Sequence, residues 1–150
     1  VGAEVEHYAA DISRTISLGK PTRRQIQVHA AVLDVQQFAF GLLKPGLTRK
    51  EYESKVEHYM GEKLCELGLL KKPTHKQIRH YYPHATSHFM GLNVHDAGDY
   101  DSPFEAGTVM TVEPGIYIPE EGIGVRIEDD VLITKNGIKI LSDKLSRDLI

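Results

Sequence analysis

The hydrophobic pattern of the chain changes from extended to helical and back to extended, and this order constrains the fold most. Residues 1–8 alternate loosely and residues 11–18 are rich in Ile and Thr, so two short strands are expected, joined near residues 8–10. Two helical segments follow, and residues 109–118 and 124–134 then predict two strands. This order predicts an α+β fold, with helices on one face of a curved, mainly antiparallel sheet.

The helical segments begin at capping boxes, in which Thr is followed three residues later by Gln or Glu. Thr22 with Gln25 predicts the first helix, and Thr48 with Glu51 predicts the second. Apolar residues keep the helical period after each box. Gly68 stands where a glycine commonly follows the end of a helix. The sequence therefore predicts two helices that pack through broad apolar stripes.

The remaining segments are short or irregular. Residues 73–81 favour one further helical turn, whereas residues 84–100 lose periodicity and are typical of a functional loop. Residues 119–122 predict a turn between the two long strands. The Lys-Asn-Gly sequence at 135–137 predicts a hairpin that leads into a last strand over residues 138–141.

Composition limits the classes of function. The 150 residues are 41% hydrophobic and 26% charged, which suits one domain with its own core. The net charge is −3 and no basic stripe occurs, so a nucleic-acid or anionic-membrane surface has no support. No apolar run approaches the ~18 residues of a membrane span, and no secretory leader is expected. The single Cys65 cannot form an internal disulfide, so a reducing, cytoplasmic location is expected.

Four short motifs contain the residues that can bind a metal or take part in catalysis. They are Asp11 in DISRT, His84 and His88 in HATSH, Glu113 in VEPG, and Glu128 in RIEDD. Carboxylates can bridge two cations and a neutral imidazole can complete a ligand shell, so this set suits a binuclear divalent-metal site. Each motif also has a plainer interpretation; Asp11, for example, fits a turn aspartate.

The two glutamates illustrate these alternatives. Glu113 lies in an apolar strand, where a carboxylate is costly to bury unless it is paired or metal-bound, but alternation also permits a solvent-facing position. Pro114 cannot donate to a ladder, so the strand is expected to end or bulge there. Alternation puts Arg126, Glu128 and Asp130 on one face, and this pattern alone favours a surface ion pair.

The loop of residues 84–100, called the histidine loop below, also allows two interpretations. His84 and His88 would share a face on a helix, but the flanking proline and glycine disfavour a helix here. In the functional interpretation, one histidine of this loop is a metal ligand and one or two others, including His95, contact the substrate. In the alternative, all three histidines lie in solvent or in the core. No G-x-S-x-G, P-loop or G-x-G-x-x-G motif occurs, so a serine nucleophile or a nucleotide site has no support.

Taken in order, these motifs resemble the catalytic domain of the aminopeptidase P and prolidase family, the pita-bread metallopeptidases. Residues 84–98 resemble the family's His-Gly-x-x-His and Gly-Leu-Asp-Val-His-Asp signature. Residues 111–117 resemble its Val-Glu-Pro-Gly strand, and residues 122–130 its Gly-Ile-Gly-x-Arg-Ile-Glu-Asp strand. Residues 2–20 resemble the strand pair that carries its two metal aspartates. The resemblance implies the C-terminal portion of a pita-bread fold.

The resemblance also implies a metal centre. It makes Asp11 and Glu128 bridging ligands, and His88 and Glu113 the ligands that complete the second metal. Two divalent ions are expected, with Mn²⁺ first and Co²⁺ or Zn²⁺ as alternatives. A hydroxide shared by the two ions would attack the carbonyl before a proline and release the N-terminal residue, with Glu113 as general base.

Four further residues are assigned by the same resemblance. His84 and His95 would contact the substrate and stabilise the tetrahedral intermediate, and Tyr117 and Arg126 would lie beside the site. The substrates would be peptides with proline in the second position, and the full-length parent would be a homo-oligomer. The alternatives are a prolidase restricted to X-Pro dipeptides and a metal-free pita-bread binding module; retention of the four acidic and histidine ligands argues against the module.

The sequence departs from the family pattern in three respects. Ala85 replaces the usual Gly, which would cost ~1 kcal/mol if that position needs a positive φ, and Asn93 replaces a usual Asp. The family's first metal aspartate would stand immediately before Val1. Residues 1–150 are therefore expected to form a single partial catalytic domain, the second half plus the central strand pair. The N-terminal domain and first half would be missing, and the chain would be inactive alone.

Overall fold

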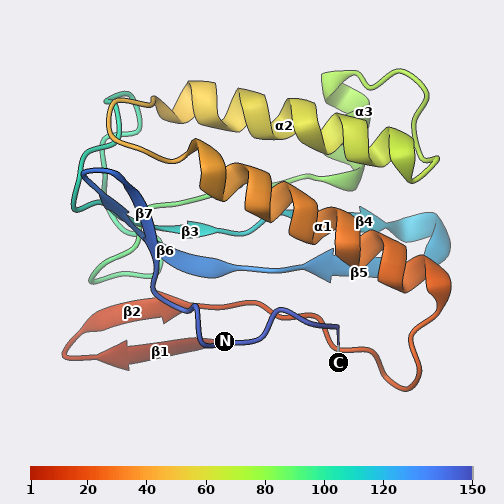
Figure 1. Cartoon of the computed structure of the whole chain (residues 1–150), viewed down its shortest axis with the longest axis horizontal. Helices are drawn as coiled ribbons and strands as arrows, with labels where there is room; N and C mark the ends of the chain where they lie inside the picture. The colour runs from red at the N-terminus through yellow and green to blue at the C-terminus, as the bar shows by residue number, and fades with distance from the viewer. Residues whose placement is uncertain (150) are drawn as a thin grey trace.

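The computed structural model describes residues 1–149 and has the α+β class predicted from the sequence. Each strand pair in this range is antiparallel, and the pairs form three sheets, β1-β2, β3-β6-β7 and β4-β5. The helices lie on one side of strands β3 to β6, and the β1-β2 hairpin lies on the other (Figure 1). The elements are β1 (Gly2–Val5), β2 (Tyr8–Asp11), α1 (Arg23–Leu42), α2 (Arg49–Glu66), α3 (His75–Tyr81), β3 (Val109–Val112), β4 (Gly115–Ile118), the 3-10 helix η1 (Pro119–Glu121), β5 (Ile123–Arg126), β6 (Asp129–Thr134) and β7 (Gly137–Ile140).

Capping boxes start the three α-helices of the described chain. The Thr22 hydroxyl accepts from the backbone N–H of Gln25, whose side chain accepts from the backbone N–H of Thr22. Thr48 and Glu51 repeat this exchange at α2. The short α3 begins in the same way at Thr74, within the turn predicted over residues 73–81. Each cap contributes about 1 kcal/mol and fixes where its helix begins.

The core lies between the helices and the strands. Val32 and Val35 of α1 and Met60 of α2 are fully buried, as are Ile116 of β4 and Ile127 between β5 and β6. Burying side chains of this size contributes about 1.5–3 kcal/mol each. This packing holds β4 and β5 against α1, so the helix supports the strands that flank Glu113 and Glu128.

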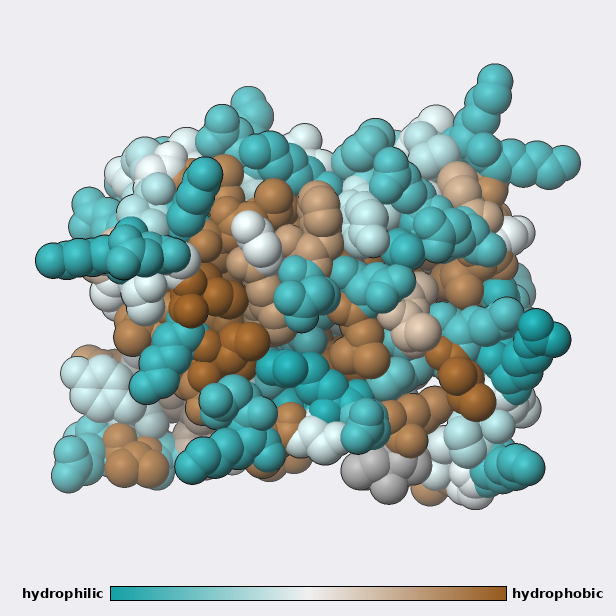
Figure 2. Space-filling model, in the orientation of Figure 1, coloured by the Kyte–Doolittle hydropathy of each residue, from teal (hydrophilic) through white to brown (hydrophobic). Residues whose placement is uncertain are grey.

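The surface is mixed in character. On the face of Figure 2, hydrophobic residues show in the middle and hydrophilic side chains project along the outline. Val5, Tyr8 and Leu18, all in or near the N-terminal hairpin, are exposed despite their apolar side chains. Among residues 1–149, no helix has the length and apolar character needed to cross a membrane.

The strands predicted over residues 109–118 and 124–134 are each divided, which corrects that prediction. The first is broken at residues 113–114 and the second at residues 127–128. The first break falls where Pro114 was expected to end or distort the strand, because proline lacks a backbone N–H. The second break has no such marker in the sequence.

At both breaks the backbone pairs with a segment from elsewhere in the chain. The N–H of Glu113 donates to the carbonyl of Thr86 at 2.8 Å, and the N–H of Glu128 donates to the carbonyl of Ser13 at 3.0 Å. The breaks therefore let the histidine loop and the segment after β2 reach the two glutamates. These long-range pairings are the physical reason that the predicted strands are not continuous.

The N-terminal hairpin also differs from the prediction. Its turn lies at Glu6 and His7, with φ of 51° and 72°, rather than at residues 8–10, which belong to β2. Two-residue hairpin turns commonly need such left-handed residues because the turn must match the strand twist. The strand expected over residues 11–18 is reduced to one bridge between Ser13 and Glu128 beyond the end of β2.

The other predicted connections are confirmed. Residues 84–100 contain no helix or named strand, and β6 and β7 pair from Thr134 and Gly137 across the Lys-Asn turn. Gly68 follows α2 with a φ of 74°, as expected for a glycine just after a helix. The turn predicted over residues 119–122 is the 3-10 helix η1 followed by a left-handed Gly122.

Candidate metal centre

Segments that are far apart in the sequence meet beside the end of β2. Ligand atoms of Asp11, His88 and Glu128 lie within 4.8 Å of one another. The Nε2 atom of His88 is 3.8 Å from Oδ2 of Asp11 and 3.5 Å from Oε1 of Glu113. The four residues predicted as metal ligands are therefore neighbours in space.

His88 presents an unpaired ring nitrogen to this cluster. Its Nδ1 lies 3.0 Å from the carbonyl oxygen of Phe89, which can only accept, so Nδ1 carries the proton. In the neutral ring, the opposite nitrogen, Nε2, carries the lone pair, and this atom is buried without a hydrogen-bond partner. Buried polar atoms are rarely left unpaired, and a metal ligand is one explanation for such an atom.

The carboxylates of the cluster crowd one another in a partly buried setting. Burial, and then the charge of Glu128, raises the pKa of Glu113 to about 7. Burial also raises the pKa of Glu128, with a further contribution from Asp11. Burial raises the pKa of Asp130 to about 6. Without a compensating cation, ionised carboxylates at this spacing repel each other.

The donor set therefore fits a divalent cation. Hard carboxylate oxygens and one imidazole nitrogen are ligands that suit Mn²⁺, Co²⁺ and Zn²⁺. A bound cation would satisfy Nε2 of His88 and favour the ionised form of the neighbouring acids. The observation that decides this fit is the buried Nε2 of His88, which has no hydrogen-bond partner and faces carboxylates from separate segments of the chain.

A second group of side chains flanks the cluster. The Nδ1 of His84 donates to the carbonyl of Ala85 at 2.9 Å, so its Nε2 accepts the hydroxyl proton of Tyr117 at 2.8 Å. Burial lowers the pKa of His84 and raises the pKa of Tyr117, so both side chains are neutral near pH 7. Arg126 is more exposed and donates from Nε to the hydroxyl of Ser13 at 3.1 Å.

His95 lies against the metal-ligand candidate His88. The two imidazole rings have centroids 4.1 Å apart and are tilted by 41°. His95 is exposed whereas His88 is buried, so His95 forms the solvent side of the pair. This position suits a residue that contacts a bound molecule rather than a buried core histidine.

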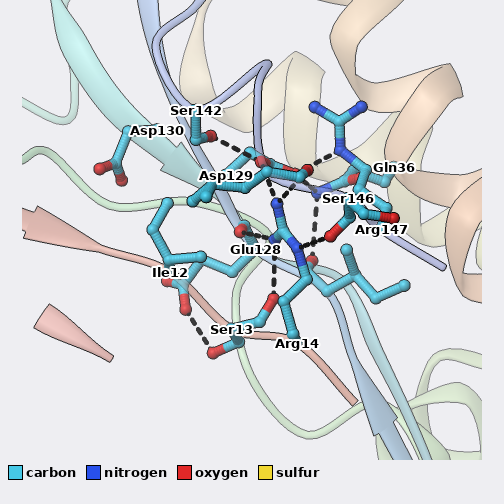
Figure 3. Close-up of polar contacts among 12 residues, drawn as sticks. Ile12, Ser13, Arg14, Gln36, Glu128, Asp129, Asp130, Ser142, Ser146 and Arg147 are labelled. Carbon is cyan, nitrogen blue, oxygen red and sulfur yellow. Dashed lines mark hydrogen bonds and ion pairs between the residues drawn. The ribbon is translucent and has the colours of Figure 1, made fainter. Parts of the chain in front are cut away.

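Three residues of the site were not assigned from the sequence. The Ser13 hydroxyl donates to Oε2 of Glu128 at 2.6 Å (Figure 3), and the Thr111 hydroxyl accepts from the backbone N–H of His88 at 3.2 Å. Asp130 accepts from the backbone N–H of Asp11 at 3.2 Å. Only Asp130 had a usable signal, because alternation placed it on the face of Glu128. The contacts of Ser13 and Thr111 depend on long-range packing.

The two substitutions relative to the family pattern are accommodated. Within residues 1–149, Glu6 and His7 are the non-glycine residues with positive φ, so Ala85 is not strained in the way considered above. Asn93 is exposed and its amide donates to Oδ1 of Asp96 at 3.1 Å. Neither substitution removes a group from the cluster around His88.

Known proteins resemble this chain over most of its length. The model of metallopeptidase family M24 matches residues 1–135. Xaa-Pro aminopeptidase 3 of Rattus norvegicus is 40% identical over 156 residues, covering 94% of this chain and 31% of that protein. Xaa-Pro dipeptidase of Pyrococcus horikoshii is 41% identical over 154 residues, covering 100% of this chain and 40% of that protein.

Solved structures show the same relationship. A histidine-to-alanine variant of Escherichia coli aminopeptidase P has a TM-score of 0.89 and 36% identity, covering 98% of this chain and 38% of that chain. A zinc-substituted form of the E. coli enzyme in complex with product has a TM-score of 0.86 and 36% identity, covering 95% of this chain and 37% of that chain.

The fold and the convergent acidic cluster define a pita-bread metallopeptidase domain. The chain belongs to metallopeptidase family M24, in the branch that contains aminopeptidase P and prolidase. It spans less than half the length of these relatives.

Proposed function

We propose that the chain forms part of the catalytic domain of an X-Pro aminopeptidase that uses two divalent metal ions, with Mn²⁺ as the first candidate. The observation that carries this proposal is the meeting of Asp11, His88 and Glu128 within 4.8 Å around an unpaired imidazole nitrogen. The named activities of the relatives at about 40% identity support it.

In this proposal Asp11 and Glu128 would bridge the two ions, and His88 and Glu113 would complete the second. When bound, the ions supply Lewis-acid polarisation of the scissile carbonyl and lower the pKa of a coordinated water. Glu113 would accept the proton of the attacking water and pass it to the leaving proline nitrogen. Its position 3.5 Å from Nε2 of His88 keeps it close to the reacting atoms.

The flanking residues would orient the substrate. His84 and His95 would lie toward the peptide carbonyl and stabilise its developing charge, with Tyr117 fixing the ring of His84 through their 2.8 Å hydrogen bond. Arg126 would hold Ser13 and the neighbouring carboxylates in place. Proline supplies no N–H, so such a site would have to recognise the substrate by its shape and its N-terminal amine.

A calorimetric titration tests the metal part of the proposal. Mn²⁺ added to the purified chain should bind in an enthalpy-detected event that His88→Ala abolishes, whereas His58→Ala, an exposed histidine on α2, should leave it unchanged. Equal Mn²⁺ binding by both variants would contradict the assignment of His88 as a metal ligand. Absence of Mn²⁺ binding to the natural protein that carries this sequence would favour the alternative of a metal-free binding module.

Peptide turnover separates the two candidate peptidase activities. In the natural protein that carries this sequence, X-Pro-containing tripeptides should be hydrolysed at the bond before proline. Cleavage of X-Pro dipeptides alone would instead identify a prolidase, which the relative from Pyrococcus horikoshii keeps as the second candidate. The two relatives are almost equally similar to this chain, so substrate length is the deciding observation.

The organisation of the domain is a further part of the proposal. Because the chain spans 31% and 40% of the two relatives, we propose that it corresponds to the second half of a catalytic domain plus the central strand pair. Residues 1–150 alone should then show no measurable X-Pro hydrolysis with Mn²⁺, and robust turnover would overturn this division. We further propose that the natural protein is a homo-oligomer, which sedimentation would test. We also propose a cytoplasmic location, which cell fractionation would test.

A further inference from the structure

Asp129 follows Glu128 in the sequence but points to the opposite side of the strand. Its side chain has no exposed surface, and in Figure 3 it lies among arginine and serine side chains while Asp130 points away. The carboxylate accepts four hydrogen bonds, from Arg14 Nη2 (2.8 Å), Gln36 Nε2 (2.9 Å), Ser142 Oγ (2.6 Å) and Arg147 Nε (2.6 Å).

Arg14 connects this carboxylate to the segment that carries Asp11. Its Nη1 donates to the carbonyl of Ser13 at 2.9 Å and to the carbonyl of Glu128 at 2.7 Å. The same guanidinium therefore bonds to the backbone on both sides of the bridge between Ser13 and Glu128. A planar guanidinium with several donors in fixed directions can set this spacing, whereas a lysine ammonium cannot reproduce it.

Gln36 connects the same carboxylate to both strand breaks. Gln36 lies on α1, and its Nε2 is also within hydrogen-bond distance of the carbonyls of Val112 at 3.1 Å and Ile127 at 3.2 Å, so its two hydrogens are shared among three acceptors. These residues immediately precede Glu113 and Glu128. The Gln36 side chain is 1% exposed, so its amide is held in the core beneath the two glutamates.

The segment after β7 completes the hydrogen-bond network around Asp129. Arg14 also donates to the carbonyls of Leu145 and Ser146, and Ser142 and Arg147 bond directly to Asp129. The segment after β7 is therefore hydrogen-bonded on the side of Asp129, opposite the side chain of Glu128. Arg14 reaches only the backbone carbonyl of Glu128, and none of these described residues bonds to the carboxylate or imidazole of a candidate ligand.

We propose that Asp129 is a positioning residue that, through Arg14 and Gln36, sets the spacing of the candidate metal ligands on the opposite face of the strands. This inference rests on the proposed metal site. It assigns the network a role beyond stability, because its hydrogen bonds end on the backbone beside Glu113, Glu128 and the segment of Asp11. Residues that orient metal ligands in this indirect way typically change metal affinity 10- to 100-fold when altered.

The test compares Arg14→Lys and the milder Ser142→Ala with Val56→Ala, a core truncation in α2 that lies outside the network. Amide hydrogen exchange in the metal-free chain reports on the backbone directly, at the N–H of Glu128 that donates to Ser13. We expect Arg14→Lys to lower protection of this amide at least about tenfold relative to the amide of Val32 in α1. Val56→Ala should leave that ratio unchanged.

Metal affinity provides the second readout. Calorimetry should give an Mn²⁺ affinity about 10- to 100-fold weaker for Arg14→Lys and less than about 10-fold weaker for Ser142→Ala, with Val56→Ala close to the unmodified chain. An unchanged exchange ratio in Arg14→Lys overturns the positioning role, as does unchanged affinity in a chain that binds Mn²⁺. If the unmodified chain binds no Mn²⁺, the proposed function fails, and the exchange ratio alone decides whether the network positions the backbone.

Discussion

The hydroxyl of Ser13 donates a 2.6 Å hydrogen bond to Oε2 of Glu128 and accepts a 3.1 Å bond from Nε of Arg126. One small side chain thus joins the segment after β2 to two residues near the break between β5 and β6. The bond occupies one oxygen of the glutamate and fixes the rotation of its carboxylate. Ser13 therefore belongs to the candidate site although it is not a ligand.

Removing this hydroxyl should weaken metal binding without unfolding the chain. Ser13→Ala leaves Glu128 free to rotate, and we expect the Mn²⁺ affinity to fall about tenfold, as for other residues that orient metal ligands. Ser13→Thr keeps the hydroxyl and should remain within about threefold of the unmodified chain. Isothermal titration calorimetry measures both, and equal affinities for the alanine and threonine variants would contradict the role of the hydrogen bond.

The metal-free chain should lose stability between pH 4.5 and 7. The pKa of Glu113 is raised from 4.5 to about 7 in the folded chain, so the folded state holds a proton that the unfolded state releases. The free energy of unfolding therefore falls as the pH rises across this window, by at most roughly 3 kcal/mol from this group and by less once solvent screening is included. Chemical denaturation at a series of pH values measures the slope.

Two controls identify the source of this slope. Glu113→Gln should reduce it, because the amide does not titrate. Added Mn²⁺ should also reduce it, because a cation favours the ionised carboxylate. A slope that is the same in the variant and in the metal-loaded chain would show that Glu113 is not the group responsible.

The histidine loop should depend on Glu53, a partly buried glutamate of α2. Glu53 accepts from the backbone N–H of Thr86 at 3.0 and 3.1 Å and from its hydroxyl at 2.9 Å. Glu53→Gln replaces one acceptor oxygen by a donor and should lower the free energy of unfolding by about 1–3 kcal/mol. Glu51→Gln, the same change on the exposed side of the helix, keeps its capping box and should stay within about 0.5 kcal/mol. Thermal or chemical denaturation compares them.

The hydrogen bond between Tyr117 and His84 should affect turnover more than metal binding. Tyr117→Phe removes the hydroxyl that donates to Nε2 of His84. In the natural protein that carries this sequence, we expect kcat for X-Pro peptides to fall about 10- to 100-fold while Mn²⁺ affinity stays within about threefold, because neither residue is a candidate ligand. A fall in metal affinity equal to the loss of kcat would instead place Tyr117 among the groups that hold the metal.

Local sequence signals predicted the helices well and the strands less well. The capping threonines Thr22 and Thr48 marked the helix starts because capping is a local interaction. The break at residues 127–128 was missed because it depends on a hydrogen bond between Glu128 and Ser13, which are 115 residues apart. A single sequence with no contacts cannot supply such a pairing.

The candidate ligands were recognised for a different reason. Local patterns around Glu113 and Glu128 left solvent-facing alternatives open, and the ordered set of motifs resembling one family selected the functional interpretation. The network around Asp129 was not anticipated, because its donors Arg14, Gln36 and Arg147 come from three separate segments. Alternation alone had placed Asp129 on the face opposite Glu128, and that placement agrees with the structure.

The most direct test of the central claim is anomalous diffraction from crystals of the chain grown with Mn²⁺. The account predicts a manganese peak at about 2.1 Å from Nε2 of His88, with carboxylate oxygens of Asp11 or Glu128 in the same coordination shell. A peak bound only to other residues, or His88 Nε2 without metal at saturating Mn²⁺, would contradict it.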